Sequence, residues 1–422
     1  MRPQLLAIAT IPVLLTSVAF AQQYALRMLY PLGSPYDQTY ASGLDADGYT
    51  VGGSSSSTGA VPQIGIVRSA DGFHRQMGSL APCLPYGGSG LNDVSPGGRI
   101  AGSTSSVCGG YSLAASGSVL DPSGYVTYPP LPGGGDCAAS GAADDCVVGW
   151  SNRTTGCGGF LCIQTTARAM KWYSDATAVE LPISNFVVAI ANGVNGSGVV
   201  VGRAYTAENS DSAVAVRWDT DASLPVTLPA LDGTYGDALK ISDAGVVVGQ
   251  SALGAERHAT RWVGTTAQDL GALPGHTFGI AYDIDDSRGI VGYSKLDADS
   301  TESTAVLWRD GQIIDLNSLV SHAGGVVLTS ANGINSRGWI AANGIVDGKL
   351  RGFVLTPCPA DLNNDGFVED ADFSIFIVAY NILDCADPAM PAGCPADLNN
   401  DNLVDDADFV VFVAAYNALL CP

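Results

Sequence analysis

Short apolar runs that end in Gly, Asn, Asp or Ser follow one another along most of the chain, with little helical periodicity. Such runs are typical of β-strands joined by tight turns. A Val-Gly dipeptide or a near copy marks seven of them, at residues 51, 101, 148, 201, 248, 291 and 341. The spacings of 50, 47, 53, 47, 43 and 50 residues indicate a repeated unit long enough for four strands.

Each unit predicts the same order of strands. A first strand ends in turn residues, as at 193–198, and a second carries the Val-Gly pair. A third ends on a large apolar residue, most clearly Trp172, Trp218, Trp262 and Trp308, and a fourth is Leu-rich, as at 228–231. The fold class is therefore mainly β, a seven-bladed propeller. Because the tryptophans recur at one place in the unit, we expect them in the core between blades, not on an aromatic sugar platform.

The two ends of the array predict how the ring closes. The seventh unit supplies only three strands and finishes at 352–355, whereas residues 28–33 resemble a fourth strand that no unit precedes. We predict that this N-terminal strand completes the last blade, which would leave no open edge. The alternative is an open β-solenoid, which needs caps that neither end supplies.

The units resemble the HAF-repeat family of bacterial extracellular proteins. Residues 331–335 (Ala-Asn-Gly-Ile-Asn) and 259–262 (Ala-Thr-Arg-Trp) carry the resemblance, whereas units two and three have lost the tryptophan or the asparagine. The resemblance implies an extracellular blade protein and implies no activity.

The first residues predict export. Met1-Arg2 precedes an apolar run over 5–18 and the small-x-small triplet 19–21, so residues 1–21 are expected to be a signal peptide and 22–357 the propeller. A membrane anchor is the weaker alternative, because the run is short and contains Pro12. We expect a secreted or cell-surface protein with no transmembrane segment after cleavage.

Ten cysteines in an exported chain predict disulfides. Six of them lie in units one to three and allow fifteen pairings: Cys83, Cys108, Cys137, Cys146, Cys157 and Cys162. We favour Cys157–Cys162 and Cys137–Cys146, because each pair would clip a neighbouring hairpin.

Charge separates the C-terminal segment from the rest. The chain carries a formal charge of −22, which opposes binding to nucleic acid. Residues 358–422 hold twelve acidic residues and no Lys or Arg, so the carboxylates would repel one another unless a cation lay among them. Pro357-Cys358-Pro359 separates this segment from the propeller, and we place the domain boundary there.

Residues 358–385 and 394–421 are two copies of one sequence, 36 residues apart. Each contains oxygen ligands at positions 1, 3, 5, 9 and 12 of a twelve-residue loop and a carbonyl at position 7, which is calcium-loop spacing. The first set is Asp361, Asn363, Asp365, Phe367 (carbonyl), Glu369 and Asp372. The second is Asp397, Asn399, Asp401, Leu403 (carbonyl), Asp405 and Asp408.

The second loop departs from the pattern at its sixth position. Gly366 occupies this position in the first loop, whereas the second has Asn402, which tolerates the left-handed region, so we expect weaker binding rather than none. The alternative for both loops is a pair of Asx-turns on a solvated acidic face. A repeated arrangement favours two calcium ions.

Each loop leads into an amphipathic helix, with apolar residues at i, i+3, i+4 and i+7 from Phe373 and from Phe409. With the CPADLN start and the terminal Cys-Pro, residues 358–422 resemble a GC-type dockerin. The resemblance implies a small all-α calcium-binding domain of two loop-helix (EF-hand-like) motifs that docks onto a cohesin-like protein or a cell-envelope component. The bracketing cysteines predict the disulfides Cys358–Cys385 and Cys394–Cys421.

Catalytic patterns are lacking in the sequence. His74, His258, His276 and His322 are scattered, and no nucleophile elbow, zinc motif or phosphate loop occurs. Carboxylates from different blades could meet in a central channel, and the candidates are Asp45, Asp47, Asp283 and Asp285, although Asp at these turns suits hairpin geometry. We therefore predict a non-catalytic binding or display protein; the alternatives are a carbohydrate-active enzyme (a glycosidase or polysaccharide lyase) held near polysaccharide, and a C-terminal module that is only a sorting tag.

Overall fold

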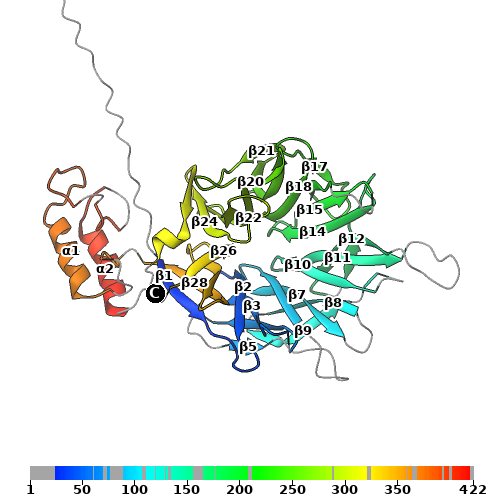
Figure 1. The fold of residues 1–422 in the computed structure, drawn as a ribbon, viewed down its shortest axis with the longest axis horizontal. Coiled ribbons are helices and arrows are strands. Elements are labelled where there is room, and N and C mark those ends of the chain that lie inside the picture. The colour runs from blue at the N-terminus through cyan, green and yellow to red at the C-terminus, as the bar shows by residue number, and fades with distance from the viewer. Residues whose placement is uncertain are drawn as a thin grey trace, which may run out of the picture. The chain divides into compact units, whose positions relative to one another are not determined.

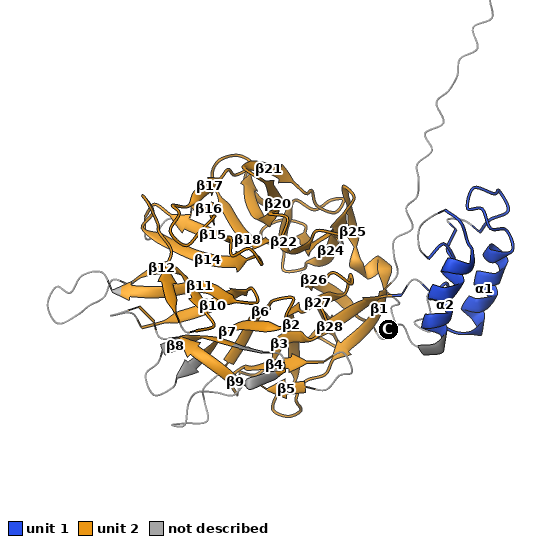
Figure 2. Ribbon diagram, turned by 180° about the vertical axis from the view of Figure 1, so that it is seen from behind, with its two compact units in different colours: residues 1–23, 358–422 blue, residues 24–357 orange. Residues whose placement is uncertain are grey.

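The computed structural model divides into two compact units, Tyr24–Pro357 and a second that contains Cys358–Pro422 (Figure 2). It describes residues 24–418 except 60, 70–73, 77–88, 107–110, 119, 129, 132–134, 155–164, 176, 208–211, 288, 321–324, 359, 364–367, 392–393 and 399–401. The expected signal peptide lies outside the described residues. Within the described part, no helix is long and apolar enough to span a bilayer.

The described strands of the larger unit form seven four-stranded antiparallel sheets, the blades of a propeller (Figure 1). Blade 1 consists of β2 (Gln38–Leu44), β3 (Thr50–Ser55), β4 (Ile64–Arg68) and β5 (His74–Gln76). Blade 2 consists of β6 (Ser89–Val94), β7 (Arg99–Ser106), β8 (Tyr111–Ser118) and β9 (Asp121–Tyr128). Blade 3 consists of β10 (Cys137–Ala142), β11 (Cys146–Thr154), β12 (Thr165–Tyr173) and β13 (Ala178–Glu180).

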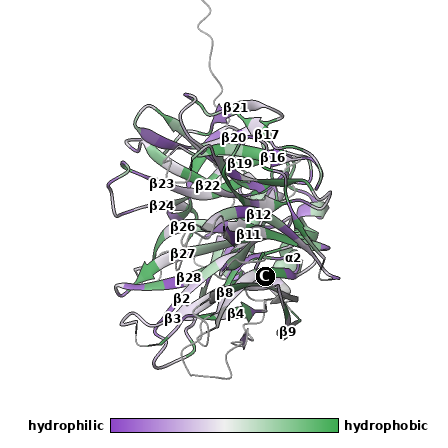
Figure 3. Cartoon of the chain, turned by 90° about the vertical axis from the view of Figure 1, so that its right-hand side faces the viewer, coloured by the Kyte–Doolittle hydropathy of each residue, from purple (hydrophilic) through white to green (hydrophobic). Residues whose placement is uncertain are grey.

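Blade 4 consists of β14 (Val188–Val194), β15 (Val200–Tyr205), β16 (Val214–Trp218) and β17 (Val226–Leu228). Blade 5 consists of β18 (Gly236–Ile241), β19 (Val247–Leu253), β20 (Glu256–Val263) and β21 (Thr266–Asp269). Blade 6 consists of β22 (Phe278–Asp285), β23 (Gly289–Lys295), β24 (Thr304–Arg309) and β25 (Gln312–Asp315), followed by the short 3-10 helix η1 (Leu316–Leu319). Apolar and polar segments are interspersed over the blades (Figure 3).

The seventh blade closes the ring as the sequence predicts. Its strands β26 (Val327–Ile334), β27 (Ile340–Val346) and β28 (Lys349–Pro357) are completed by the N-terminal β1 (Tyr24–Leu29), which runs antiparallel to β28. This pairing confirms the closure and rules out the open solenoid. The strand lies a few residues earlier than predicted and ends at Leu29; Pro31, just beyond it, has no N–H to donate to a ladder.

The Val-Gly pair has a steric cause. The first strand of every blade carries a β-bulge. The glycine of the Val-Gly pair lies on the second strand, opposite the residue just before this bulge; Gly202, for example, lies opposite Ala191. A Cβ on Gly202 would lie 2.0 Å from the carbonyl oxygen of Ile190, and a Cβ on Gly149 would lie 2.0 Å from that of Ala138. In these blades a side chain at this position would collide with the backbone of the first strand. Blade 7 has Ala342 at this position, and its first strand carries a second register shift between Leu328 and Ser330.

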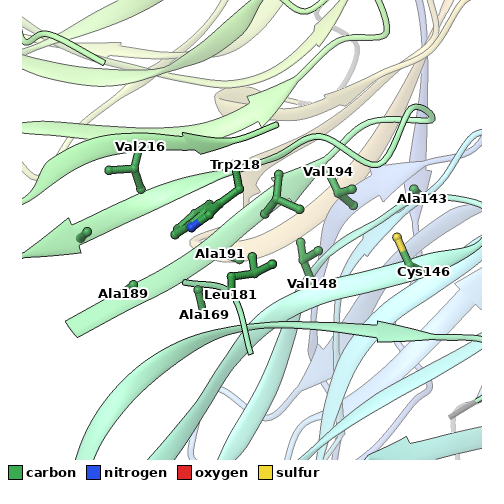
Figure 4. Close-up of a cluster of buried hydrophobic side chains, with 12 residues drawn as sticks. Ala143, Cys146, Val148, Ala169, Leu181, Ala189, Ala191, Val194, Val216 and Trp218 are labelled. Atoms are coloured by element: carbon green, nitrogen blue, oxygen red, sulfur yellow. The ribbon is translucent and has the colours of Figure 1, made fainter. Parts of the chain in front are cut away.

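The tryptophans fill the core between blades, as predicted. Trp218 is fully buried and packs with Val216 of its own blade against Val148 and Leu181 of blade 3 (Figure 4). Its indole N–H donates to the carbonyl of Pro182 in the preceding blade, at 2.7 Å. Trp262 donates in the same way to Pro229, at 2.7 Å. The indole rings of Trp218 and Trp262 thus supply both apolar burial and an inter-blade hydrogen bond, whereas the buried indole N–H of Trp172 has no partner among the described residues.

In blade 1 an arginine takes the place of tryptophan. Arg68 lies opposite Thr50 in the register at which Trp218 lies opposite Val200, and it is 4% exposed. Its guanidinium donates to the carbonyl of Tyr30, which follows the last strand of the preceding blade, at 2.5 Å. Burial, with repulsion from Arg27, lowers the pKa of Arg68 to about 10. The inter-blade hydrogen bond is kept although the residue type changes.

The smaller unit has two described helices, α1 (Asp370–Tyr380) and α2 (Asp406–Ala418). Phe376 and Phe412, both fully buried, lie with ring centroids 4.9 Å apart. The Tyr380 hydroxyl at the end of α1 donates to Asp406 at the start of α2, and the Tyr416 hydroxyl donates to Asp370 at the start of α1. The two helices are therefore antiparallel, and their contacts repeat the duplication.

The predicted disulfides of this unit are wrong. Cys385 pairs with Cys394, so the bond joins the end of the first copy to the start of the second, not the two ends of each copy. The physical reason is that the chain turns back after α1, and its turns bring Cys385 within 5.3 Å (Cα to Cα) of Cys394. Cys358 is also disulfide-bonded.

The predicted pair Cys137–Cys146 is also wrong, because both residues are free and buried. Cys137 packs with Ala114 and Tyr128 of blade 2, whereas Cys146 packs in the cluster of Trp218 of blade 4. The two thiols face opposite sides of the blade 3 sheet and cannot meet. The other favoured pair, Cys157–Cys162, lies outside the described residues, as do Cys83 and Cys108.

Candidate functional site

The first candidate site is the mouth of the propeller's central channel. A cavity of about 400 Å³ lies where the first strands of the seven blades end, and all seven blades line it. The first strand is therefore the innermost, and the residues around its bulge face the channel. A cavity of this size suits a small molecule or one end of a larger one.

One position of the innermost strand distinguishes the blades. The residue that follows the bulge is Gly43, Gly141, Gly193 and Gly333 in four blades and Asp93, Lys240 and Asp283 in blades 2, 5 and 6. Glycine allows neighbouring strands to approach closely: a Cβ on Gly193 would lie 2.6 Å from the carbonyl oxygen of Leu239. In blades 2, 5 and 6 a charged side chain occupies the position that glycine has in the other four blades.

These three side chains form an ion cluster. The Lys240 ammonium lies 2.7 and 2.8 Å from the two carboxylate oxygens of Asp93 and 3.9 Å from Asp283. Lys240 and Asp93 are three blades apart around the ring, so the bond joins distant parts of the wall. The Ala142 N–H donates to Asp93 at 2.9 Å, and the Ile334 N–H donates to Asp283 at 2.9 Å. Each carboxylate is thus fixed by the backbone of the next blade.

Burial sets the electrostatics of the cluster. Burial raises the pKa of Asp283 to about 6; Lys240 opposes this rise and Asp93 adds to it. Burial alone would lower the pKa of Lys240, but the two carboxylates outweigh it and the pKa of the ammonium is raised. Asp283 therefore titrates near neutral pH while Lys240 stays charged.

Of the four carboxylates that the sequence suggested for the channel, only Asp283 belongs to this cluster. Asp45 accepts the Tyr49 N–H at 2.8 Å and Asp285 accepts the Ser287 N–H at 3.0 Å, so both cap hairpin turns. Asp47 pairs with Arg337 at 2.8 Å on the surface. Sequence reasoning missed Asp93 and Lys240, which an alignment of the seven units on the Ala-x-Gly of the first strand would have singled out.

The histidines lie outside this cavity's lining as far as the structure describes them. His258 lies 2.9 Å from Asp269, and His276 lies 2.9 Å from the Ser294 hydroxyl. His74 is exposed on β5, and His322 is outside the described residues.

The second candidate site is the pair of loops in the smaller unit. Asp372, at the twelfth position of the first loop, is fully buried and accepts the N–H groups of Leu362 at 2.7 Å and Glu369 at 3.0 Å. Asp408, its equivalent in the second loop, is fully buried and accepts those of Leu398 at 2.7 Å and Asp405 at 3.0 Å. Each loop is therefore folded around the carboxylate of its last position.

The second loop adopts the geometry expected at its sixth position. Asn402 has φ +70°, the left-handed conformation for which glycine is usual, and its N–H donates to Asp397 of the first position at 2.9 Å. Asparagine tolerates this region. The loop thus turns sharply without glycine.

The described donors suit a hard cation. Asp361, Asn363, Glu369, Asp397 and Asp405 are also described and offer only oxygen, which Ca²⁺ prefers, and Asp361 is 7% exposed. In the first loop two described carboxylates, Asp361 and Asp372, are buried, and in the second Asp408 is buried; burial of a charge is costly unless hydrogen bonds or a cation compensate it. Asp365, Phe367, Asn399 and Asp401 lie outside the described residues. Among the described residues, the group of metal-ligating side chains that lie close together is Cys385, Cys394 and Asp397, but its two sulfurs are bonded to each other and are no metal ligands.

Comparison with known proteins gives only distant likenesses. No family model and no curated protein matches the chain. A putative TolB from Agrobacterium tumefaciens is 12% identical with a TM-score of 0.37, over 80% of this chain and 100% of that one. A TolB from Acinetobacter baumannii has the same identity and TM-score, over 58% of this chain and 62% of that one. YCF48 bound to a D1 peptide is 11% identical with a TM-score of 0.38, over 80% and 96%.

Proposed function

We propose that the protein is a secreted or cell-surface binding and display protein, held in place by a calcium-binding C-terminal module. The module spans residues 358–422, and its proposed ligands are the two loop sets given above. Bound Ca²⁺ would neutralise the clustered carboxylates and fix the loops against the helices. The observation that supports this proposal most is the repeated arrangement of Asp372 and Asp408, each buried and each hydrogen-bonded to its own loop.

The proposed docking partner is a cohesin-like protein or a cell-envelope component. Apolar side chains remain exposed on the module's helices, among them Val378 at 53%, Val410 at 67% and Val411 at 37%. Exposed aliphatic side chains on a rigid helix pair are typical of protein-binding surfaces. The acidic charge of the module opposes binding to nucleic acid.

The propeller would bind a separate ligand, such as a glycan, at the channel mouth. A second candidate function is favoured by Asp283, which lines the cavity and whose pKa burial raises to about 6, together with Asp93 of another blade, which is bonded to the cavity-lining Lys240. Paired carboxylates are the catalytic groups of many carbohydrate-active enzymes. A glycosidase or lyase would use the same cavity.

The experiment is a calcium-dependent pull-down from a cell-envelope fraction, with the full chain as bait. Binding is expected with calcium and not with a chelator, and a D361N/D397N variant should lose it, because both loops lose their first ligand. Equal recovery with and without calcium would contradict the docking role. Incubation with a polysaccharide panel separates the two propeller functions: retention without product supports binding, and released product supports the enzyme.

A further inference from the structure

The disulfide Cys385–Cys394 lies beside the second loop and contacts it on two sides. We infer that this disulfide positions the entry of the second loop and thereby sets the calcium affinity of that loop selectively. The inference rests on the proposed calcium binding and adds a means of regulating it. It concerns one loop of the two, so the two can be compared within one chain.

The segment before the disulfide pairs with the middle of the second loop. The Cys385 N–H donates to the Asn402 carbonyl at 3.2 Å, and the Val404 N–H donates to the Leu383 carbonyl at 2.8 Å. Asp384 and Leu403 form an antiparallel bridge between these bonds. Residues 383–385 are therefore a short strand against positions 6 to 8 of the loop, including Leu403, whose carbonyl is a proposed ligand.

The disulfide ties the same segment to the loop's entry. Cys394 precedes the first ligand by three residues, and its carbonyl accepts the Asp397 N–H at 3.1 Å. The Cys385 sulfur lies 3.7 Å from an Asp397 carboxylate oxygen, and that oxygen also accepts the Asn402 N–H at 2.9 Å. Asp397 is thus held between the disulfide and the turn of its own loop.

Breaking the bond should release the entry but not the middle of the loop. Cys394 is in the left-handed region at φ +52°, a conformation that a free chain rarely keeps. Without the bond, part of the free energy of calcium binding would be spent on ordering Asp397. The calcium affinity of the second loop would therefore be lower. Among the described residues, the contacts of this disulfide are with the second loop, whereas the first loop follows a different bonded cysteine, Cys358, whose carbonyl accepts the Asp361 N–H at 3.4 Å. The affinity of the first loop should not depend on this disulfide.

Calcium titration of the full chain tests the inference one loop at a time. D361N disables the first loop, so calcium titration of this variant measures the affinity of the second loop. Adding C385S/C394S to D361N should lower that affinity about tenfold or more. D397N disables the second loop, and adding C385S/C394S to D397N should leave the affinity of the first within about twofold. Amide hydrogen exchange without metal is a second readout: protection of the Asp397 amide at the loop's entry should fall, whereas that of Val404 in the middle of the loop and of Phe376 in α1 should remain.

The outcomes separate the inference from the proposed function. Unchanged affinity of the second loop would overturn the inference alone, and so would an equal loss in both loops, which would show a general role in folding. If the wild-type chain bound no calcium, the proposed function would fail and the inference with it.

Discussion

At the residue scale, single side chains or their absence decide how the innermost strands pack. Gly202 leaves room for a neighbouring carbonyl, whereas Asp93, Lys240 and Asp283 occupy the channel where other blades have glycine. The first feature lets the two inner strands pair closely in every blade but the seventh, which has Ala342 at this position. The second joins blades that are not neighbours.

Adding one methyl group at Gly202 should be costly, because the new Cβ would lie 2.0 Å from the backbone carbonyl of Ile190. We expect G202A to lower the free energy of unfolding by about 2 kcal/mol or more in urea denaturation. G90A is the matched control, since the nearest atom is the end of the flexible Gln63 side chain at 3.3 Å. Equal effects of the two substitutions would contradict the steric account.

Removing the charge of Lys240 should destabilise the propeller, because Asp93 would keep a buried charge without its partner. We expect K240M to cost about 3 kcal/mol in the same assay. The triple variant D93N/K240M/D283N removes all three charges and should recover part of that loss. A K240M protein as stable as the wild type would show that the cluster contributes nothing to ring stability.

The pH dependence of stability should identify Asp283. Its pKa of about 6 in the folded protein lies above the ordinary 3.8, so its stabilising contribution is complete below about pH 4 and is lost as the pH rises through 6. Asparagine does not titrate. Relative to the wild type, D283N should therefore gain roughly 1 to 3 kcal/mol between about pH 4 and pH 7. A constant difference between the two across this range would contradict the shifted pKa.

At the element scale, the two loop-helix motifs support each other through an antiparallel aromatic core. Phe412 is fully buried against Phe376, whereas Val410 on the same helix is 67% exposed. This difference in exposure predicts that Phe412 stabilises the helix pair and that Val410 does not.

We expect F412A to destabilise the smaller unit by about 3 to 5 kcal/mol, and V410A to leave its stability within about 0.5 kcal/mol. Calorimetric melting of the full chain, followed through the transition of this unit, measures both. V410A should instead weaken calcium-dependent docking. A V410A variant as destabilised as F412A would show that the exposed face is part of the core.

At the scale of the whole molecule, one strand from the start of the chain closes a ring built from its later residues. The repeat period, the incomplete last unit and residues near 28 were enough to predict this closure, because each blade is a local unit with its own turn signals. The buried tryptophans and the left-handed Asn402 were predictable for the same reason: their causes lie within one unit.

Features that depend on packing between units were not predictable. The Asp93–Lys240 bond joins residues 147 positions apart, and only the curvature of the ring brings them together. The disulfide Cys385–Cys394 depends on how the chain turns back after α1, and the free thiols of Cys137 and Cys146 depend on which face of the blade 3 sheet each takes. The bracketing cysteines of each copy and the short spacing of Cys137 and Cys146 favoured other disulfides, and these predictions were wrong.

The most direct test of the central claim is differential scanning calorimetry of the full chain with calcium and with a chelator. Ligand that binds only the folded state stabilises it by about 2.7 kcal/mol per site at a concentration of about 100 times Kd. We therefore predict two transitions, of which the one that D361N and D397N alter moves to higher temperature with calcium while the propeller transition stays constant. If neither transition moves between chelator and saturating calcium, the loops are not calcium sites and the account of tethering is wrong.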